Sequence, residues 1–448
     1  MIENMIEMIN KTPINVTELQ SYFRKMNTVD IADIFENLSK ERTIQIFRLL
    51  PKDISADVFS YIVSEKQQII VEALTDTEVG KIIDELFADD AVDFIEEMPA
   101  NVVKRVLQNV SEDRRQLINH LLQYPEDSAG SIMTTEYVAL REYSTVREAF
   151  DEIRSTGVNK ETIYTCYVIR RDRLLVGVVT AKILMLSKPQ DLIGDVMDTN
   201  MKFAHTTDDQ EIIAGLFRKY SLLSIPIVDK ERRLVGIVTV DDIVHIIEEE
   251  ATEDFEKMAA ISPSDEPYMK TGVFEHARNR IVWLLLLMLS ATITGSIISG
   301  FEDILSTIPV LVAFIPMLMD TGGNAGSQSS VLIVRGMALG EIEIKDIFKV
   351  LWREARVGAL CGFALGAVNF IRVYIMNGGD LQLCVTVSAS LIATVIIAKA
   401  VGCTLPFIAK MLKMDPAVMT APVVTTIADA AALMVYFTLA MMLMSFQI

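Results

Sequence analysis

The chain has 448 residues, 51% of them hydrophobic, and a formal net charge of −19 at pH 7. This acidity argues against a nucleic-acid-binding protein, because such proteins need clustered Lys and Arg to neutralise phosphates. The sequence holds no H-E-x-x-H, P-loop or nucleophile-elbow motif, so an enzyme is not expected. The four cysteines show neither metal-site spacing nor a disulfide framework.

The charge is divided unequally along the chain. Residues 1–270 carry 49 Asp and Glu against 30 Lys and Arg, whereas residues 271–448 carry 11 of each and are mostly apolar. The sequence therefore predicts an acidic, water-exposed part joined to a membrane domain. The acidity favours cations as partners, although it also simply confers solubility.

Residues 1–128 are predicted to form a helical domain. Apolar residues recur at helical spacing, as at Ile31, Ile34, Phe35 and Leu38. Similar runs return at a loose period of about 24 residues, which is typical of a superhelical stack of helix pairs. An ordinary helical bundle is the alternative.

Residues 129–242 contain an internal repeat. The segment TCYVIRRDRLLVGVVT at 165–180 aligns without gaps with SIPIVDKERRLVGIVT at 224–239. Each copy predicts a strand, a polar turn, a second strand and a following helix, with Met133 and Met197 near the two repeat starts. Two small α/β modules packed on each other are expected.

Residues 243–270 are predicted to form a helix that connects to the membrane domain. Apolar positions such as Ile243 and Ile246 alternate with a dense acidic run that includes 248–250. Like charges this close repel, and divalent cations between facing acidic surfaces would relieve the repulsion. A plainly solvated helix face is the alternative.

Residues 271–448 contain five candidate spans of the length needed to cross a bilayer. They are Ile281–Gly300, about Ile304–Val334, Val350–Ile375, Leu383–Ile408 and Ala417–Phe446. Basic residues precede the first span and cluster in the second and fourth connections. The positive-inside rule then places residues 1–280 in the cytoplasm and the C-terminus outside.

Asp429 lies within the last apolar span, near the middle of the bilayer. An ionisable residue there marks a functional site by default. Three interpretations are open: a protonated, tolerated carboxyl; a buried pair with Lys399; or an aqueous cation site, with Lys399 reaching toward the cytoplasmic face.

The second span is rich in glycine and polar residues. Gly322, Gly323 and Gly326 lie among polar neighbours such as Asp320 and Asn324. We expect the glycines to interrupt the helix, with non-helical backbone lining a water-filled cavity; a kinked helix is the alternative. A few hard oxygens that share the ion with water suit Mg²⁺, although Na⁺, Ca²⁺, Co²⁺ and Ni²⁺ remain open.

The doubled α/β module resembles a tandem CBS-domain pair. Together with the motifs PMLMDTGGNAGSQSS (316–330) and DPAVMTAPVVTTIAD (415–429), the domain order resembles an MgtE-type magnesium channel over nearly the whole chain. The resemblance implies a superhelical N domain, a CBS pair, a connecting plug helix and a five-helix pore domain. It also implies a homodimer in the cell membrane, with the second and fifth helices lining the pore.

In that family the plug closes the pore when Mg²⁺ bridges acidic surfaces of the cytoplasmic domains. Besides Asp429 in the pore, the ligands that the resemblance carries over are Asp57, Asp89, Asp93, Asp229, Glu231, Asp241, Asp265 and Asp415, with Asp90 as an alternative to Asp89.

CBS pairs often bind adenosine nucleotides such as ATP through a Thr and an Asp three residues later. Thr239 and Asp242 fit this pattern, whereas Thr180 is followed by Ile183. At most one such site per chain is expected, and a purely structural role is the alternative.

The predicted function is therefore Mg²⁺ uptake across the cell membrane, closed by intracellular Mg²⁺. A Co²⁺ or Ni²⁺ permease, a divalent cation exporter, and a membrane-anchored CBS nucleotide sensor are the alternatives.

Overall fold

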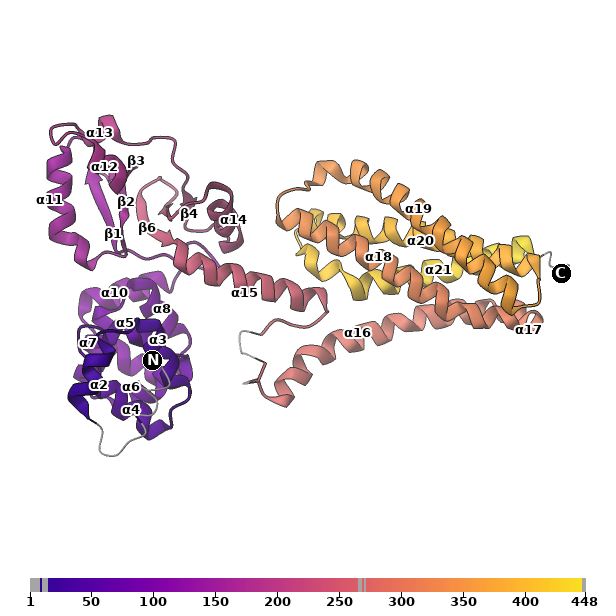
Figure 1. Ribbon diagram of the computed structural model, residues 1–448, viewed down its shortest axis with the longest axis horizontal. Helices are drawn as coiled ribbons and strands as arrows, with labels where there is room; N and C mark the ends of the chain where they lie inside the picture. The colour runs from indigo at the N-terminus through magenta and orange to yellow at the C-terminus, as the bar shows by residue number, and fades with distance from the viewer. Residues whose placement is uncertain (1–8, 10–14, 265–267, 270, 445–448) are drawn as a thin grey trace. The chain divides into compact units, whose positions relative to one another are not determined.

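The computed structural model describes residue 9 and residues 15–264, 268–269 and 271–444 (Figure 1). The chain divides into two compact units, Met1–Ile247 and Glu248–Ile448. Each unit is described by itself below.

The first part of the N-terminal unit is a stack of short helices. Its helices are α2 (Val16–Phe23), α3 (Thr28–Glu36), α4 (Lys40–Leu49), α5 (Ser55–Ser60), α6 (Ser64–Ala73), α7 (Asp76–Glu85), α8 (Ala88–Glu96), α9 (Ala100–Asn109) and α10 (Glu112–Leu121). Alternate helices begin 24 residues apart, at Lys40, Ser64, Ala88 and Glu112. Alternate helices also contact each other: α4 contacts α6, and α7 contacts α9. The predicted 24-residue period is therefore confirmed.

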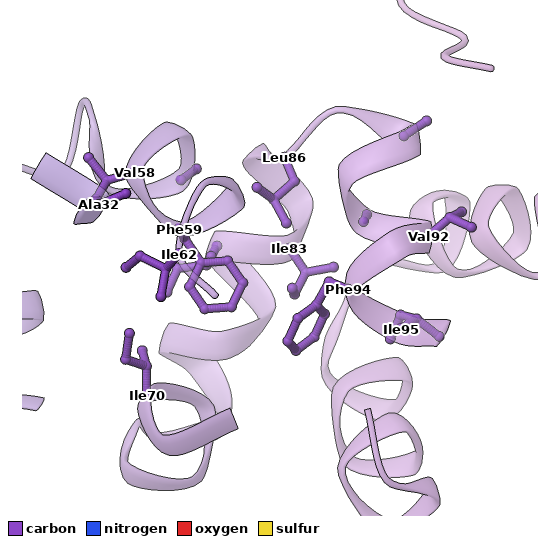
Figure 2. Close-up of a cluster of buried hydrophobic side chains, with 14 of the residues drawn as sticks. Ala32, Val58, Phe59, Ile62, Ile70, Ile83, Leu86, Val92, Phe94 and Ile95 are labelled. Carbon is purple, nitrogen blue, oxygen red and sulfur yellow. The ribbon is translucent and has the colours of Figure 1, made fainter. Parts of the chain in front are cut away.

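Apolar side chains from several helices meet inside this stack (Figure 2). Phe59 on α5 and Phe94 on α8 pack edge to face, with ring centroids 5.2 Å apart. This geometry brings the positive edge of one ring to the negative face of the other. Ile83 and Leu86 lie beside them and are also buried.

The second part of the N-terminal unit contains the two predicted α/β modules. The first consists of β1 (Tyr137–Arg141), α11 (Val146–Thr156), the 3₁₀ helix η1 (Gly157–Asn159), β2 (Thr162–Ile169), β3 (Leu175–Thr180) and α12 (Ala181–Leu186). The second consists of α13 (Ile193–Val196), β4 (Ala204–His205), α14 (Gln210–Tyr220), β5 (Ser224–Val228), β6 (Leu234–Thr239) and the start of α15 (Val240–Met258). In each three-stranded sheet the middle strand pairs parallel with the first strand and antiparallel with the third. The predicted strand–turn–strand–helix repeat is confirmed.

The two modules exchange their leading segments. Met197, which starts the second repeat, packs on Gly177 of the first, where a Cβ would lie 2.6 Å from the Met197 sulfur. Met133, which starts the first repeat, packs on Gly236 of the second in the same way, at 2.7 Å. The repeated glycine is therefore needed for close approach, and the exchange joins the two modules.

The C-terminal unit is a bundle of long helices. They are α16 (Val273–Gly300), α17 (Glu302–Thr307), the 3₁₀ helix η2 (Pro309–Phe314), α18 (Ile315–Ala338), the 3₁₀ helix η3 (Ile344–Asp346), α19 (Ile347–Met376), α20 (Leu381–Met411), the 3₁₀ helix η4 (Pro416–Met419) and α21 (Ala421–Leu443). Helices α18 to α21 run side by side, and α16 packs on α21 (Figure 1).

Within the described residues, four helical stretches are long and apolar enough to cross a membrane. They are Val273–Gly300, Ile344–Met376, Leu381–Met411 and Pro416–Leu443. Helix α18 is 24 residues long, but polar residues lower its hydropathy. The predicted second span also begins too early, because α18 starts only at Ile315 and the residues before it form α17 and η2.

The expected interruption of the second span is wrong. Helix α18 is continuous through Gly322, Gly323 and Gly326, and Pro316 lies in its first turn, where a missing N–H costs no hydrogen bond. The glycines serve packing instead. A Cβ on Gly402 of α20 would lie 2.1 Å from the Gly326 carbonyl oxygen, so only two glycines let these helices approach this closely.

Candidate functional site

Helix α18 carries a polar face in a bundle of otherwise apolar helices. Asp320, Asn324 and Gln328 are spaced four residues apart and are exposed. Residues at this spacing share one side of a helix. The opposite side is buried, and there Gly322 and Gly326 contact side chains and backbone of α20 and α21. Helix α18 therefore has one packed side and one polar side.

Asp429 lies on α21, the helix that packs on α18. Its neighbours Ala428 and Ala432 are buried, whereas Asp429 is half-buried. The carboxylate of Asp320 lies near enough to act on Asp429 electrostatically. The structure thus brings together two carboxylates from neighbouring helices. We had not predicted Asp320 as a site residue, although its spacing from Asn324 and Gln328 was a signal for it.

The predicted alternative of an Asp429–Lys399 pair is wrong. Lys399 pairs with Glu354 of α19, with 3.8 Å between the ammonium and the carboxylate oxygen, and also contacts the Ser329 hydroxyl at 3.2 Å. Lys399 is only 5% exposed, so it does not reach out toward a membrane surface either. Lys399 therefore does not neutralise the charge of Asp429.

Acidic side chains gather around α8 in the N-terminal unit. Burial, together with repulsion from Asp242 and Asp57, raises the pKa of Asp90 to about 7. Desolvation by the surrounding protein and repulsion from Asp90 raise the pKa of Asp93 to about 7 as well, although part of the Asp93 side chain is exposed. Asp89 is more deeply buried and its pKa is also well above the ordinary value. The predicted Asp57, Asp89 and Asp93 therefore belong to one electrostatic cluster, which also includes the alternative Asp90. We call it the α8 cluster.

Two members of this cluster come from the α/β modules. Burial and repulsion from Asp242 and Asp241 raise the pKa of Glu161 to about 8. One carboxylate oxygen of Glu161 is buried and has no hydrogen-bond partner among the described residues. Glu161 was missed because it stands alone in the sequence, before β2, and only folding brings it near α8.

Asp242 belongs to the same cluster and to the predicted nucleotide pair. The Thr239 hydroxyl donates a 2.6 Å hydrogen bond to the Asp242 carboxylate. In the first repeat, the Thr180 hydroxyl instead accepts a hydrogen bond from the Ile183 backbone N–H and caps α12. The two repeats therefore differ at this position, as the sequence predicts.

Asp229 and Glu231 lie in the turn between β5 and β6. The Asp229 carboxylate accepts hydrogen bonds from the backbone N–H groups of Glu231 and Arg233, at 3.0 and 2.8 Å. Asp229 thus shapes the turn, and Glu231 is exposed. Among the described residues, neither the Asp229 nor the Glu231 side chain forms a hydrogen bond or an ion pair with a member of the α8 cluster.

Asp415 lies at the start of η4 in the C-terminal unit. Its carboxylate accepts a hydrogen bond from the Ala417 backbone N–H and forms a 2.8 Å ion pair with Lys257 of α15. Lys257 also pairs with Glu253 at 2.6 Å. Asp265, the remaining predicted ligand, lies outside the described residues.

No group of three His, Cys, Asp or Glu side chains is placed to hold a metal ion anywhere in the described part of the chain.

A helical stack, a pair of exchanged α/β modules and a bundle of long apolar helices with a carboxylate-bearing face define a polytopic membrane transport protein. Family models agree in the same order. The MgtE intracellular N domain matches residues 26–127, the CBS domain matches 129–187 and 193–249, and the MgtE divalent cation transporter matches 315–439.

Two relatives are similar along almost the whole chain. The magnesium transporter MgtE of Thermus thermophilus is 35% identical over 430 residues, which cover 95% of each chain. The magnesium transporter MgtE of Bacillus subtilis is 33% identical over 429 residues, 95% of this chain and 94% of the relative. The crystal structure of the soluble part of a magnesium transporter matches with a TM-score of 0.54 and 28% identity, covering 56% of this chain and all of that one.

The chain belongs to the MgtE family. Members of this family are transporters and not enzymes, as the sequence predicts.

Proposed function

We propose that the chain is a homodimeric Mg²⁺ channel of the cell membrane, which takes up Mg²⁺ and is closed by intracellular Mg²⁺. The observation that carries this proposal is that Asp429 and Asp320 lie on two packed helices of an apolar bundle, near enough for their carboxylates to repel each other. Charged groups in such a bundle are expensive, and an ion path is one of the main roles for which they are retained. The names of the relatives support Mg²⁺ as the ion.

The chemistry of the polar face suits a hydrated divalent ion. It offers the Asp320 carboxylate and the amide oxygens of Asn324 and Gln328, and α21 adds the Asp429 carboxylate; all of these are hard oxygen ligands. Mg²⁺ dehydrates reluctantly and usually keeps several waters beside one or two carboxylates. A two-fold axis would double these groups into a ring that attracts the ion without holding it tightly.

The proposed pore needs α18 as a fifth span. Its 24 residues correspond to about 36 Å of helix, which exceeds the hydrocarbon thickness of a bilayer. The orientation follows from the basic residues in the connections, with the N-terminal unit in the cytoplasm and the C-terminus outside.

Cation binding to the α8 cluster is the proposed sensor. The raised pKa values of Asp90, Asp93 and Glu161 reflect burial and mutual repulsion, which a divalent cation would relieve. A cation that binds this arrangement of the carboxylates more tightly than other arrangements of them shifts the population toward this arrangement. The difference in binding free energy sets the size of the shift. The plug in this proposal is α15, and Thr239 with Asp242 would hold the ribose of one adenosine nucleotide such as ATP.

A flux measurement tests the proposal. Purified protein in vesicles with Mg²⁺ as the permeant divalent ion should carry Mg²⁺, and Asp429→Asn should lower the flux about tenfold or more. Asp303→Asn, which removes an exposed carboxylate between α16 and α18, should leave the flux unchanged. A nucleotide sensor anchored by its helices would carry no flux in either form, and a Co²⁺ or Ni²⁺ permease would prefer those ions.

A further inference from the structure

Three polar side chains from three different helices meet inside the bundle, away from the polar face. Lys399 on α20 pairs with Glu354 on α19 at 3.8 Å, and Ser329 on α18 lies between them. The Ser329 hydroxyl donates a 2.5 Å hydrogen bond to the Glu354 carboxylate, and the Lys399 ammonium donates to the Ser329 hydroxyl at 3.2 Å. Ser329 and Lys399 are 0% and 5% exposed.

The close packing of the helices makes room for this group. Gly358 of α19 lies beside the Lys399 side chain, where a Cβ would be 3.5 Å from its Cδ. The contact between Gly326 and Gly402 brings α18 against α20 one turn before Ser329. The Lys399 ammonium also approaches the Ala325 carbonyl oxygen at 3.5 Å, so it contacts α18 at two points.

A buried ion pair is weak evidence for stability. Removing two charges from water costs about as much as their attraction returns, and well-packed apolar residues often stabilise a core as well. The best-attested use of such a group is to fix one arrangement of helices among several similar ones. The question is therefore which arrangement this group fixes.

Ser329 lies on the side of α18 opposite to the polar face. It follows Asp320 by nine residues, which at about 100° per residue is two and a half turns, so the two side chains point in opposite directions. The packed side is lined by small residues at Gly322, Gly323, Ala325 and Gly326, and such a smooth stretch would let α18 turn or slide against its neighbours. The Ser329 hydrogen bonds are specific in direction and would hold one rotation.

We propose that Ser329, Glu354 and Lys399 are positioning residues for conduction. They fix the rotation of α18 and thereby direct Asp320, Asn324 and Gln328 toward the ion path. The three side chains do not contact the permeating ion. This inference rests on the proposed function for its flux consequence, but the rotation of α18 is a property of the bundle itself.

The first experiment measures rotation without flux. In a chain whose four native cysteines are replaced by alanine, Asn324→Cys is labelled with a water-soluble thiol reagent in vesicles. Adding Ser329→Ala, or the pair Lys399→Met with Glu354→Met, should change the labelling rate about fivefold to tenfold. Ser390→Ala is the matched control, because Ser390 is also buried but donates only to the Thr386 carbonyl of its own helix.

The second experiment measures conduction in vesicles that hold the same variants with Asn324 left intact. The apolar double variant should remain folded, with a melting temperature near that of the wild type, because neither charge is left unpaired. Its flux ratio of Mg²⁺ to Ca²⁺ should nevertheless fall about tenfold. Lys399→Met alone leaves the partly buried Glu354 without a counter-charge, so this variant should unfold more readily than the double variant.

Unchanged labelling at position 324 in both Ser329→Ala and the folded double variant would overturn the inference. Unchanged labelling with an altered melting temperature would show that the group only stabilises the bundle, which also overturns it. If the wild-type protein carried no Mg²⁺, the proposed function would fail, and the labelling rates would still decide whether this group sets the rotation of α18.

Discussion

Lys257 and Asp415 form a 2.8 Å ion pair that joins the last turn of α15 to the start of η4, immediately before α21. A second contact lies beside it, because the Thr420 hydroxyl donates a 3.0 Å hydrogen bond to the Met258 carbonyl oxygen. Partial burial disfavours the ammonium, yet hydrogen bonds to Asp415 and Glu253 raise the pKa of Lys257, so the lysine is charged. The chain thus places its own cation beside Asp415, which the family resemblance predicts to be a Mg²⁺ ligand.

We expect Lys257→Met to weaken closure of the proposed channel. Without the ammonium, Asp415, Glu253 and Asp254 repel one another, and Mg²⁺ must supply the missing charge. Mg²⁺ flux should therefore be higher at low internal Mg²⁺, and the concentration that halves the flux should rise about threefold to tenfold. The measurement is flux into vesicles of graded internal Mg²⁺.

Lys410→Met is the control for that variant, because it removes one exposed positive charge near the end of α20 without touching Asp415. Inhibition at lower Mg²⁺ in Lys257→Met would contradict the prediction. That result would mean that the lysine competes with the metal for Asp415 and does not assist closure.

The contact between α18 and α20 gives a prediction about stability. In Gly326→Ala, the new Cβ would lie 2.6 Å from a methyl carbon of Val424 and 2.9 Å from the Ala398 carbonyl oxygen. The backbone oxygen is held within α20, so the helices must separate, at a cost of about 1–3 kcal/mol. Thermal unfolding in detergent should show a melting temperature lower by several degrees.

Gly295→Ala is the matched control for Gly326→Ala. Gly295 also lies inside a long helix, but nothing lies within 4 Å of its added Cβ. Alanine has the higher helix propensity, so this variant should be as stable as the wild type or slightly more stable. Equal melting temperatures for both variants would show that the close approach of α18 and α20 is not needed.

Much of the architecture was predictable from the sequence, because the helical stack and the pair of α/β modules each carry a repeated sequence pattern. The 24-residue helical repeat and the aligned copies at 165–180 and 224–239 are local patterns, and the structure confirms both. The glycines of α18 were misread because a glycine that breaks a helix and a glycine that packs it look alike in sequence. Only the position of Gly402 on another helix distinguishes the two cases.

The candidate site was only partly predictable for a similar reason. Asp429 stands out because it is a charge in an apolar run, and that signal is local. Lys399 carries the same kind of signal, but its partner Glu354 lies 45 positions earlier, near basic residues that made the segment look like a membrane boundary. Pairings of this kind depend on which helices pack together, and the sequence does not state that.

The hydrogen bond between Thr239 and Asp242 gives a prediction about nucleotide binding. Asp242 is the carboxylate placed to accept ribose hydroxyls in the proposed site, and Thr239 holds it at 2.6 Å. Asp242→Ala should weaken binding of ATP about tenfold or more, as expected for a lost hydrogen bond to a charged group. Titration calorimetry on the full chain in detergent should give about one ATP per chain for the wild type.

Thr180→Val is the control for nucleotide binding, because Thr180 caps α12 and is followed by Ile183 where the second repeat has Asp242. Two ATP molecules per chain, or equal loss in both variants, would contradict a single site in the second repeat.

The α8 cluster predicts how stability depends on pH and on Mg²⁺. In the unfolded chain its carboxyls titrate near their ordinary values of 3.8 and 4.5, whereas in the folded chain the pKa is about 7 for Asp90 and about 8 for Glu161. The folded state therefore binds more protons between these limits, and the free energy of unfolding falls as the pH rises from about 4 to about 8. Thermal unfolding of the full chain should show a higher melting temperature at pH 6 than at pH 8. Mg²⁺ should raise the melting temperature more at pH 8, where protons no longer neutralise the cluster.

The double variant Asp90→Asn with Asp93→Asn should reduce both the pH effect and the Mg²⁺ effect, whereas Asp113→Asn on the exposed side of α10 should change neither. A Mg²⁺ effect of equal size at both pH values would contradict this prediction, because binding would then not require the ionised carboxylates.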